Sequence, residues 1–299
     1  MPDYSIWALE FAQLPNYPDT ALVYGKSEGA RMLPFYYVLL QSDDHVLLID
    51  AGFDNNDYGR DMIDRYGITI WKSPAEILPR VCLTPEDVDT IILTHHHFDH
   101  AGGLGLFPNA QVFVQRREID NFHAKYNVTP RMSWLANGLD PDTPSVLATI
   151  ESEGRLNVLD GPAEVLPGID VRPAFDTHTA GSQYAVLTPT DGTPWIFPGD
   201  VVYVYDNLVG PNEDGILTPI GLGQGNQECC IRTTDEMLTA AGDDIRRILP
   251  WHEHRIWERY PSITFDDGLH MAEIDLAPNT PSRVHPPGAQ PGRVAHSQL

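Results

Sequence analysis

Four histidines and one aspartate lie within the six residues that run from His95 to His100, directly after an apolar run. Imidazole and carboxylate groups are ligands for zinc, iron, manganese and cobalt. His95 and His97 are two residues apart, so on an extended segment they point to the same side and can share one ion. Asp99 and His100 follow where the chain must turn, and they can reach a second ion. His96 points the opposite way and is not expected to be a ligand. The cluster therefore predicts a metal site.

The elements around this cluster place it where α/β proteins gather active groups. Residues 84–87 begin with threonine and proline, which favour the start of a short helix. The apolar stretch 90–94 is typical of a buried strand, and the histidines follow its carboxyl end directly. The stretch Ala101-Gly102-Gly103 lets the backbone approach closely and is expected to begin a new helix.

The remaining chain alternates between strand-like and helix-like segments. Aromatic and branched residues predict strands, with the first two joined as a hairpin, at 35–43, 45–52, 110–115, 154–160, 168–175, 182–190, 193–200 and 246–254. Periodic apolar residues predict helices at 58–66, 116–125 and 226–249. Strands followed by a helix occur in both halves, which is consistent with an α/β fold built as a four-layer αββα sandwich.

One domain is expected over residues 1–277, with insertions near 53–80 and 126–150. Residues 278–299 are rich in proline and lack periodicity, so they predict an extended arm or a disordered tail. Two segments are candidate walls for a substrate: the insertion at 126–150, which contains Trp134, and residues 207–228.

Composition limits the classes of partner. The 299 residues include 42 acidic and 19 basic side chains, for a formal net charge of −23. Such a chain repels phosphate backbones and anionic membranes. No apolar run reaches the roughly 18–20 residues that span a bilayer, and the first residues do not resemble a secretory signal. We therefore expect a cytoplasmic protein, monomeric or homodimeric, that acts on a small molecule and binds neither nucleic acid nor membrane.

The pattern His-x-His-x-Asp-His-Ala-Gly-Gly after an apolar strand resembles the metallo-β-lactamase superfamily. The resemblance implies further ligands at later strand ends, and the chain offers residues for each. His178 lies in a short loop before a strand, Asp200 follows a strand in a Gly-Asp pair, and His252 follows a final strand, with His254 as the competing choice. The resemblance covers about residues 20–262.

The resemblance implies a site with two divalent metal ions, with zinc expected and iron, manganese or cobalt as alternatives. The implied ligands fall into two sets: His95, His97 and His178 for one ion, and Asp99, His100 and His252 for the other. Asp200 would bridge the ions together with a water. Asp50 resembles an aspartate that supports the ligands from behind, although it also fits a turn carboxylate that ends a strand.

Details near the ligands resemble the N-acyl homoserine lactone lactonases in particular. The residues from Phe98 to Gly103 match the pattern of that branch. The commonest β-lactamases carry a cysteine at the bridging position, whereas this chain has aspartate there and no cysteine near the ligands. The resemblance implies a quorum-quenching lactonase in which a metal-bridging hydroxide attacks the lactone carbonyl. Tyr203 would hydrogen-bond that carbonyl, or is simply a core aromatic residue, and Asp99 would shuttle a proton to the leaving oxygen.

Other activities on the same scaffold stay open at this point. They include hydrolysis of a thioester, removal of halogen from an aromatic ring, and iron-dependent redox chemistry. The net charge argues against a nucleic-acid-processing hydrolase. A purely structural metal module is disfavoured because the ligand set is that of an open, catalytic site.

Overall fold

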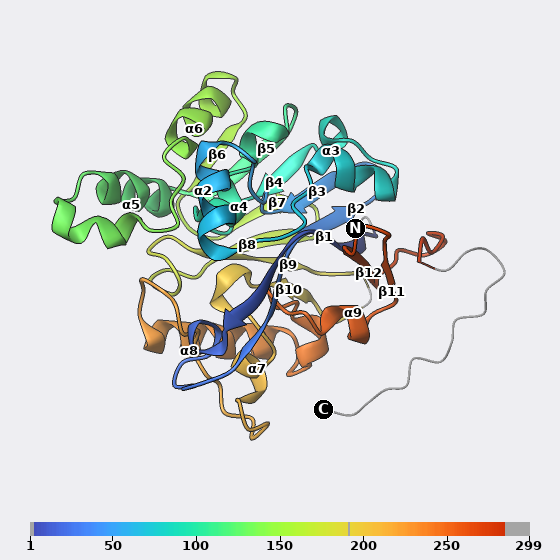
Figure 1. The fold of residues 1–299 in the computed structure, drawn as a ribbon. Helices are drawn as coiled ribbons and strands as arrows, with labels where there is room; N and C mark the ends of the chain where they lie inside the picture. The colour runs from blue at the N-terminus through green and yellow to red at the C-terminus, as the bar shows by residue number, and fades with distance from the viewer. Residues whose placement is uncertain (1–2, 191, 285–299) are drawn as a thin grey trace.

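Two β-sheets lie face to face in the computed structural model, which describes residues 3–190 and 192–284 (Figure 1). The larger sheet has eight strands in the order β11-β12-β1-β2-β3-β4-β5-β6. Its strands are β1 (Ser5–Pro18), β2 (Ala30–Gln41), β3 (Val46–Ile49), β4 (Thr90–Ile92), β5 (Gln111–Gln115), β6 (Leu156–Leu159), β11 (Ser262–Thr264) and β12 (His270–Asp275). Strands β3 to β6 are parallel to one another, whereas β1, β2, β11 and β12 pair antiparallel.

The smaller sheet has four antiparallel strands in the order β10-β9-β8-β7. They are β7 (Ala163–Leu166), β8 (Ile169–Pro173), β9 (Gln183–Leu187) and β10 (Trp195–Phe197). A single bridge pairs Ile196 of β10 with Ile248, so the chain before His252 runs along the edge of this sheet.

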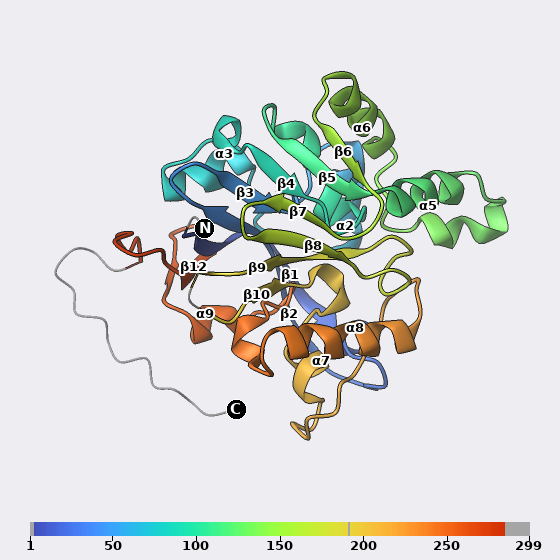
Figure 2. The same cartoon turned by 180° about the vertical axis from the view of Figure 1, so that it is seen from behind.

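Helices lie on the outer sides of the two sheets, and α8 lies at the opposite end of the molecule from α3 and α6 in both views (Figure 2). The α-helices are α1 (Asp19–Leu22), α2 (Asp57–Tyr66), α3 (Pro74–Ile77), α4 (Phe98–Ala101), α5 (Arg116–Tyr126), α6 (Thr143–Ser152), α7 (Asp206–Val209), α8 (Gln227–Ala240) and α9 (Ile256–Arg259). Short 3-10 helices are η1 (Leu78–Val81), η2 (Pro85–Asp87), η3 (Leu104–Leu106), η4 (Pro130–Ala136), η5 (Gly199–Val201) and η6 (Ile245–Arg247).

Strand β2 shows how the layers form. Successive side chains of a strand point to opposite faces of the sheet. Phe35, Tyr37 and Leu39 enter a core that includes residues of α2, α3 and α6. Tyr36 and Val38 enter a second core shared with the small sheet and α8. The large sheet is therefore buried on both faces, and the predicted four-layer αββα sandwich is confirmed.

Most of the predicted elements are confirmed, and the differences have local causes. The hairpin forms β2 and β3, and two of the predicted helices are α2 and α5. The third, predicted over 226–249, is α8, but it ends at Ala240 and a turn with Gly242 at positive φ follows. The helix expected after Gly102 begins earlier, at Phe98, because the backbone already turns within the histidine cluster. The expected strand at 246–254 does not form: it contains the end of η6, a single bridge at Ile248, and irregular and turn residues.

The ends of the chain add two findings. The sequence did not single out β1, although it is the longest strand and pairs with both β2 and β12. In the predicted C-terminal arm, the Val284 N–H donates to Glu273 of β12 at 3.2 Å. Residues 285–299 of this arm, and Asp191 between two of the predicted strands, lie outside the described residues. The predicted boundary at 277 stays a prediction.

The insertions predicted near 53–80 and 126–150 carry secondary structure of their own. The first contains α2, α3 and η1, and the second contains η4 and α6. Within the described chain, no helix is both long enough and apolar enough to cross a membrane.

The core around β2 gives a test of the layer assignment. Leu39 is fully buried between the large sheet and its helices. We expect Leu39→Ala to lower the free energy of unfolding by about 3 kcal/mol, because the lost contacts leave a cavity. Tyr24→Ala is the control, since Tyr24 is 53% exposed and should change stability by less than about 0.5 kcal/mol. Urea unfolding of both variants measures the difference, and equal costs would contradict the assignment.

Candidate metal centre

The carboxylate of Asp200 lies between two groups of metal-competent side chains. The first group is His95, His97 and His178, and the second group is Asp99, His100 and His252. Oδ2 of Asp200 faces the first group, 3.3 Å from Nε2 of His178. Oδ1 faces the second group, 3.2 Å from Nε2 of His100 and 3.3 Å from Nε2 of His252. One carboxylate thus offers one oxygen to each group.

In the first group, three imidazole nitrogens converge on one point. Nδ1 of His97 lies 3.0 Å from Nε2 of His95 and 2.7 Å from Nε2 of His178. His95 and His97 come from the segment after β4, as their spacing predicts. His178 comes from the loop before β9, where the family resemblance placed it. These nitrogens and a carboxylate oxygen of Asp200 all lie within 4.8 Å of one another.

In the second group, an aspartate and two histidines meet beside the first. Oδ2 of Asp99 lies 3.5 Å from Nε2 of His100 and 3.7 Å from Nε2 of His252. The structure places His252 in this group, whereas His254 is one-third exposed and contacts Glu253 instead. The backbone explains the choice, because the His252 N–H donates to the Tyr203 carbonyl at 2.9 Å.

The outward-facing nitrogens of His100 and His252 have partners that orient their rings. Nδ1 of His100 lies 2.6 Å from Oδ2 of Asp50, which also accepts from the Thr94 hydroxyl. Nδ1 of His252 donates to the Pro34 carbonyl at 3.0 Å. Asp50 therefore supports a candidate ligand from behind and does more than end a strand, an arrangement typical of metal sites.

Burial and neighbouring charges set the protonation of the first group. Burial lowers the pKa of all three imidazoles, and neighbouring histidines lower the pKa of His95 and His97 further. Neutral imidazole is the form that binds a metal. Burial raises the pKa of the Asp200 carboxyl, but the nearby histidines His100 and His252 outweigh it, so that the pKa lies well below its usual range.

The second group has the opposite balance. Burial lowers the pKa of His100 and His252, but the negative charges of Asp200 and Asp99 outweigh it and raise both values. This part of the site therefore favours positive charge. Nε2 of His100 and Oδ1 of Asp200 are buried and have no hydrogen-bond partner among the described residues. A divalent cation fits this donor set, because it would satisfy both atoms and supply the positive charge.

Tyr203 and the surrounding walls form a cavity over both groups. The Tyr203 hydroxyl lies 3.4 Å from Nδ1 of His178 and donates to the Leu222 carbonyl at 3.2 Å. Burial, together with the charge of Asp200, raises the pKa of Tyr203, so the phenol keeps its proton. Both expected wall segments reach the cavity, through Trp134 and Leu222.

The cavity is mostly apolar. Strands β1 and β2 contribute Leu14, Leu33 and Phe35 to its walls. Among the described residues that line it, the charged ones are Asp99 and Asp200, apart from histidines, and none is lysine or arginine.

Two buried glutamates beside the ligands were not assigned from the sequence. Glu118 lies shortly after β5, and Glu253 follows His252 in the chain. The exposed fractions of these residues are 1% and 0%, respectively. In the sequence, the signal for a role in the site was the position of each carboxylate, shortly after a strand or beside a ligand. Only the burial seen in the structure distinguishes these glutamates from solvated surface charges.

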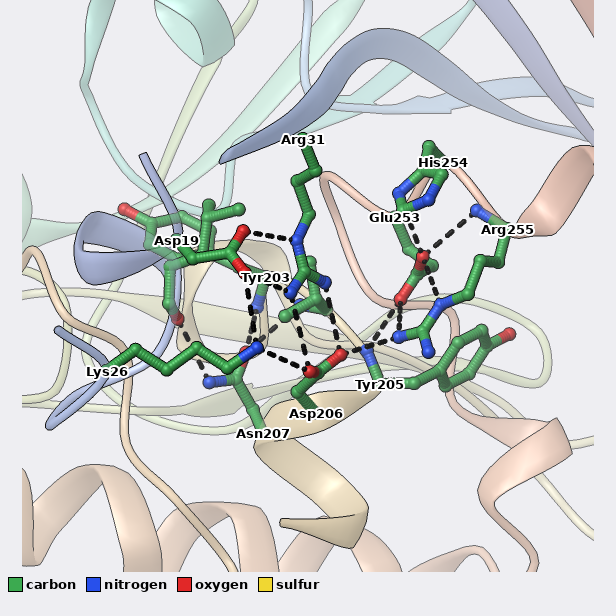
Figure 3. Close-up of polar contacts among 12 residues, drawn as sticks. Asp19, Lys26, Arg31, Tyr203, Tyr205, Asp206, Asn207, Glu253, His254 and Arg255 are labelled. Atoms are coloured by element: carbon green, nitrogen blue, oxygen red, sulfur yellow. Dashed lines mark hydrogen bonds and ion pairs between the residues drawn. The ribbon is translucent and has the colours of Figure 1, made fainter. Parts of the chain in front are cut away.

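Glu253 belongs to an ion-pair network behind His252 (Figure 3). It accepts from the Tyr205 N–H at 2.8 Å and from Arg255. Arg255 also pairs with Asp206 at 2.7 Å, and Asp206 pairs with Arg31 of β2 at 3.1 Å. The network thus joins three parts of the chain that position the site: the loop after His252, the segment after Tyr203, and β2.

The family model described as the metallo-beta-lactamase superfamily matches residues 33–252, a span that includes every candidate ligand. The chain therefore belongs to the metallo-beta-lactamase superfamily. It is a metallo-hydrolase of this superfamily, and its similarities lie in the lactonase-like branch.

Curated relatives include two N-acyl homoserine lactonases. The protein from Bacillus sp is 26% identical over 190 residues, which is 59% of this chain and 67% of that protein. The protein from Bacillus cereus is 29% identical over 185 residues, with the same coverage.

Solved structures support the same fold. A probable metal-dependent hydrolase from Staphylococcus aureus is 21% identical, with a TM-score of 0.65, and covers 85% of this chain and 90% of that one. A quorum-quenching N-acyl homoserine lactone lactonase is 18% identical, with a TM-score of 0.60, and covers 85% and 94%.

The network behind His252 has a testable acid dependence. The side chain of Asp206 is only 13% exposed. Burial raises the pKa of its carboxyl, but the positive charges of Arg31, Arg255 and Lys26 outweigh burial, so the net effect is a lowered pKa. At pH 7 we expect Asp206→Asn to lower the free energy of unfolding by about 2 kcal/mol, because Arg31, Arg255 and Lys26 each lose one of two carboxylate partners.

The acid titration supplies the second half of this test. A lowered folded-state pKa stabilises the protein above the unfolded value of about 3.9. The difference between wild type and Asp206→Asn should therefore shrink as pH falls below about 4. Asp57→Asn is the control, since the Asp57 side chain is 97% exposed beside Arg60. A difference that stays constant down to pH 2 would contradict the assignment.

Proposed function

We propose that the protein is a lactonase that hydrolyses the ring ester of a small, neutral lactone with the help of two divalent metal ions. Zinc is the expected metal. The observation that carries the proposal is the placement of Asp200, whose two oxygens face two separate groups of ligands. The lactonase names of the curated relatives support the same activity.

We assign His95, His97 and His178 to one ion, Asp99, His100 and His252 to the other, and Asp200 to both. When bound, such a pair of ions polarises a carbonyl group and makes water a nucleophile near neutral pH.

Two cavity residues act on the substrate in this proposal. Tyr203 keeps its proton and lines the cavity beside His178, so its hydroxyl can exchange the bond to the Leu222 carbonyl for one to the lactone carbonyl when the substrate binds. Asp99 also lines the cavity, and its carboxylate can pass a proton to the ring oxygen as the ring opens. Donors placed where negative charge develops stabilise the transition state most.

The walls of the cavity favour a neutral substrate with an apolar substituent. Its described lining offers Leu14, Phe35 and Trp134 but no lysine or arginine. A thioester that carries carboxylates away from the reacting bond would find no lysine or arginine in the described lining to pair with them, and burying an unpaired charge is costly. An uncharged acyl lactone meets no such penalty.

Metal analysis and a substrate panel test the proposal. The purified protein should hold two metal ions per chain, and the loaded enzyme should open acyl-homoserine lactones faster than thioesters or chlorinated aromatics. Activity on thioesters alone, or on the chlorinated aromatics alone, would overturn the lactone assignment. One iron per chain with oxygen consumption would instead identify a redox enzyme.

Removing the Tyr203 hydroxyl tests its role. We expect Tyr203→Phe to lower kcat/KM for lactones by about 100-fold, because one donor to the developing oxyanion is lost. The metal content should stay at the wild-type level. Tyr205→Phe is the matched control, since Tyr205 is buried two residues along but does not line the cavity. Steady-state kinetics measure both variants, and wild-type turnover in Tyr203→Phe would exclude the proposed role.

A further inference from the structure

Glu118 is a buried carboxylate at the start of α5, outside the two ligand groups. It is 1% exposed, and a carboxylate so far from water needs several donors. Its donors come from two segments that are far apart in sequence, and both of these segments carry candidate ligands.

The first segment is the histidine cluster itself. The His96 N–H donates to Oε1 of Glu118 at 3.1 Å, and the His96 ring also contacts this oxygen through Nδ1. His96 lies between His95 and His97, whose side chains point to the metal site. A bond to the His96 backbone therefore fixes the segment from which both of these ligands project.

The second segment is the loop that begins with His178. The Thr179 hydroxyl lies 2.9 and 2.8 Å from the two oxygens of Glu118, and the Gly181 N–H donates to Oε2 at 2.8 Å. The loop also packs directly on α5: a Cβ added to Gly181 would lie 2.1 Å from the Glu118 nitrogen. Thr179 follows the ligand His178 immediately, so its bond constrains that ligand.

We infer that Glu118 is a positioning residue of the metal centre, which holds the segment of His95 and His97 and the loop of His178 in the register that one ion requires. This inference rests on the proposed function, because it presupposes that the first group binds a metal. Partners behind the ligands commonly contribute a 10- to 100-fold effect on metal affinity.

A second buried glutamate separates this role from general stabilisation. Glu10 of β1 is also fully buried and accepts from the N–H and from Nδ1 of His270 on β12, at 2.9 and 2.6 Å. Its hydrogen-bond partners within the described chain are Gln13 and His270, neither of which is a candidate ligand. Glu10→Gln is thus a matched control for Glu118→Gln.

The test measures metal binding by the full-length apo-protein, independently of turnover. Competition with a chromophoric chelator gives the affinity for Zn²⁺, and the visible spectrum of the Co²⁺-loaded protein reports the ligand geometry. We expect Glu118→Gln to weaken Zn²⁺ binding by about 10- to 100-fold and to change the Co²⁺ spectrum. Glu10→Gln should lower stability while leaving both metal readouts as in wild type.

Thr179 supplies a milder pair of variants in case Glu118→Gln does not fold. Thr179→Val removes the hydroxyl with little change in shape and should weaken Zn²⁺ binding, whereas Thr179→Ser keeps the hydroxyl and should restore it. Wild-type affinity and spectrum in folded Glu118→Gln, or in Thr179→Val, would overturn the inference alone. Failure of the wild-type protein to bind Zn²⁺ or Co²⁺ would instead overturn the proposed function.

Discussion

A single buried carboxylate, that of Asp200, lies between two groups of ligands and offers one oxygen to each. Asp200 can do this only if the histidines on either side present nitrogens at about 3.3 Å, which leaves little tolerance in the surrounding loops. Gly199 shows how tight the fit is. A Cβ there would lie 2.7 Å from the Thr94 hydroxyl oxygen, and its φ of +55° favours glycine. The loop of Asp200 therefore rests directly on the end of β4.

Three further buried carboxylates stabilise the loops around this centre. Asp50 contacts His100, Glu118 contacts the residue between His95 and His97, and Glu253 follows His252 in the chain. Each accepts hydrogen bonds from backbone N–H groups. These bonds offset the cost of burying the charge and hold the loop in one conformation. The loops that carry the ligands are thus held by local polar contacts, while the two sheets hold the loops at a fixed separation.

The sequence predicted the parts of this arrangement that depend on short spacing. The step of two residues between His95 and His97 places both on one side of an extended segment, and the structure has them so. His178, Asp200 and His252 could be named only through the family resemblance, since nothing local to them specifies a shared ion. The choice of His252 over His254 depends on a backbone bond to Tyr203, a contact between segments distant in sequence.

Long-range contacts also explain what the sequence did not reveal. Glu118 appears as one charged residue in a helical stretch, and its importance arises from two segments folded against it. Strand β1 lacks a simple alternation because both of its faces are buried, so its residues are buried without a break from Ser5 to Leu14. The segment before His252 has a strand-like composition but pairs through a single bridge, because the turns around it end the ladder.

The walls of the cavity and the candidate ligands at its base come from different parts of the fold. Trp134 lies in the short helix η4 and Leu222 in the connection between α7 and α8, whereas the ligands sit in loops and short helices at the edges of the two sheets. Amino-acid changes at these two side chains can reshape the space above the ligands without altering a ligand. Natural selection can therefore redirect such an enzyme to new compounds through its walls, while the chemistry at the bottom of the cavity stays the same.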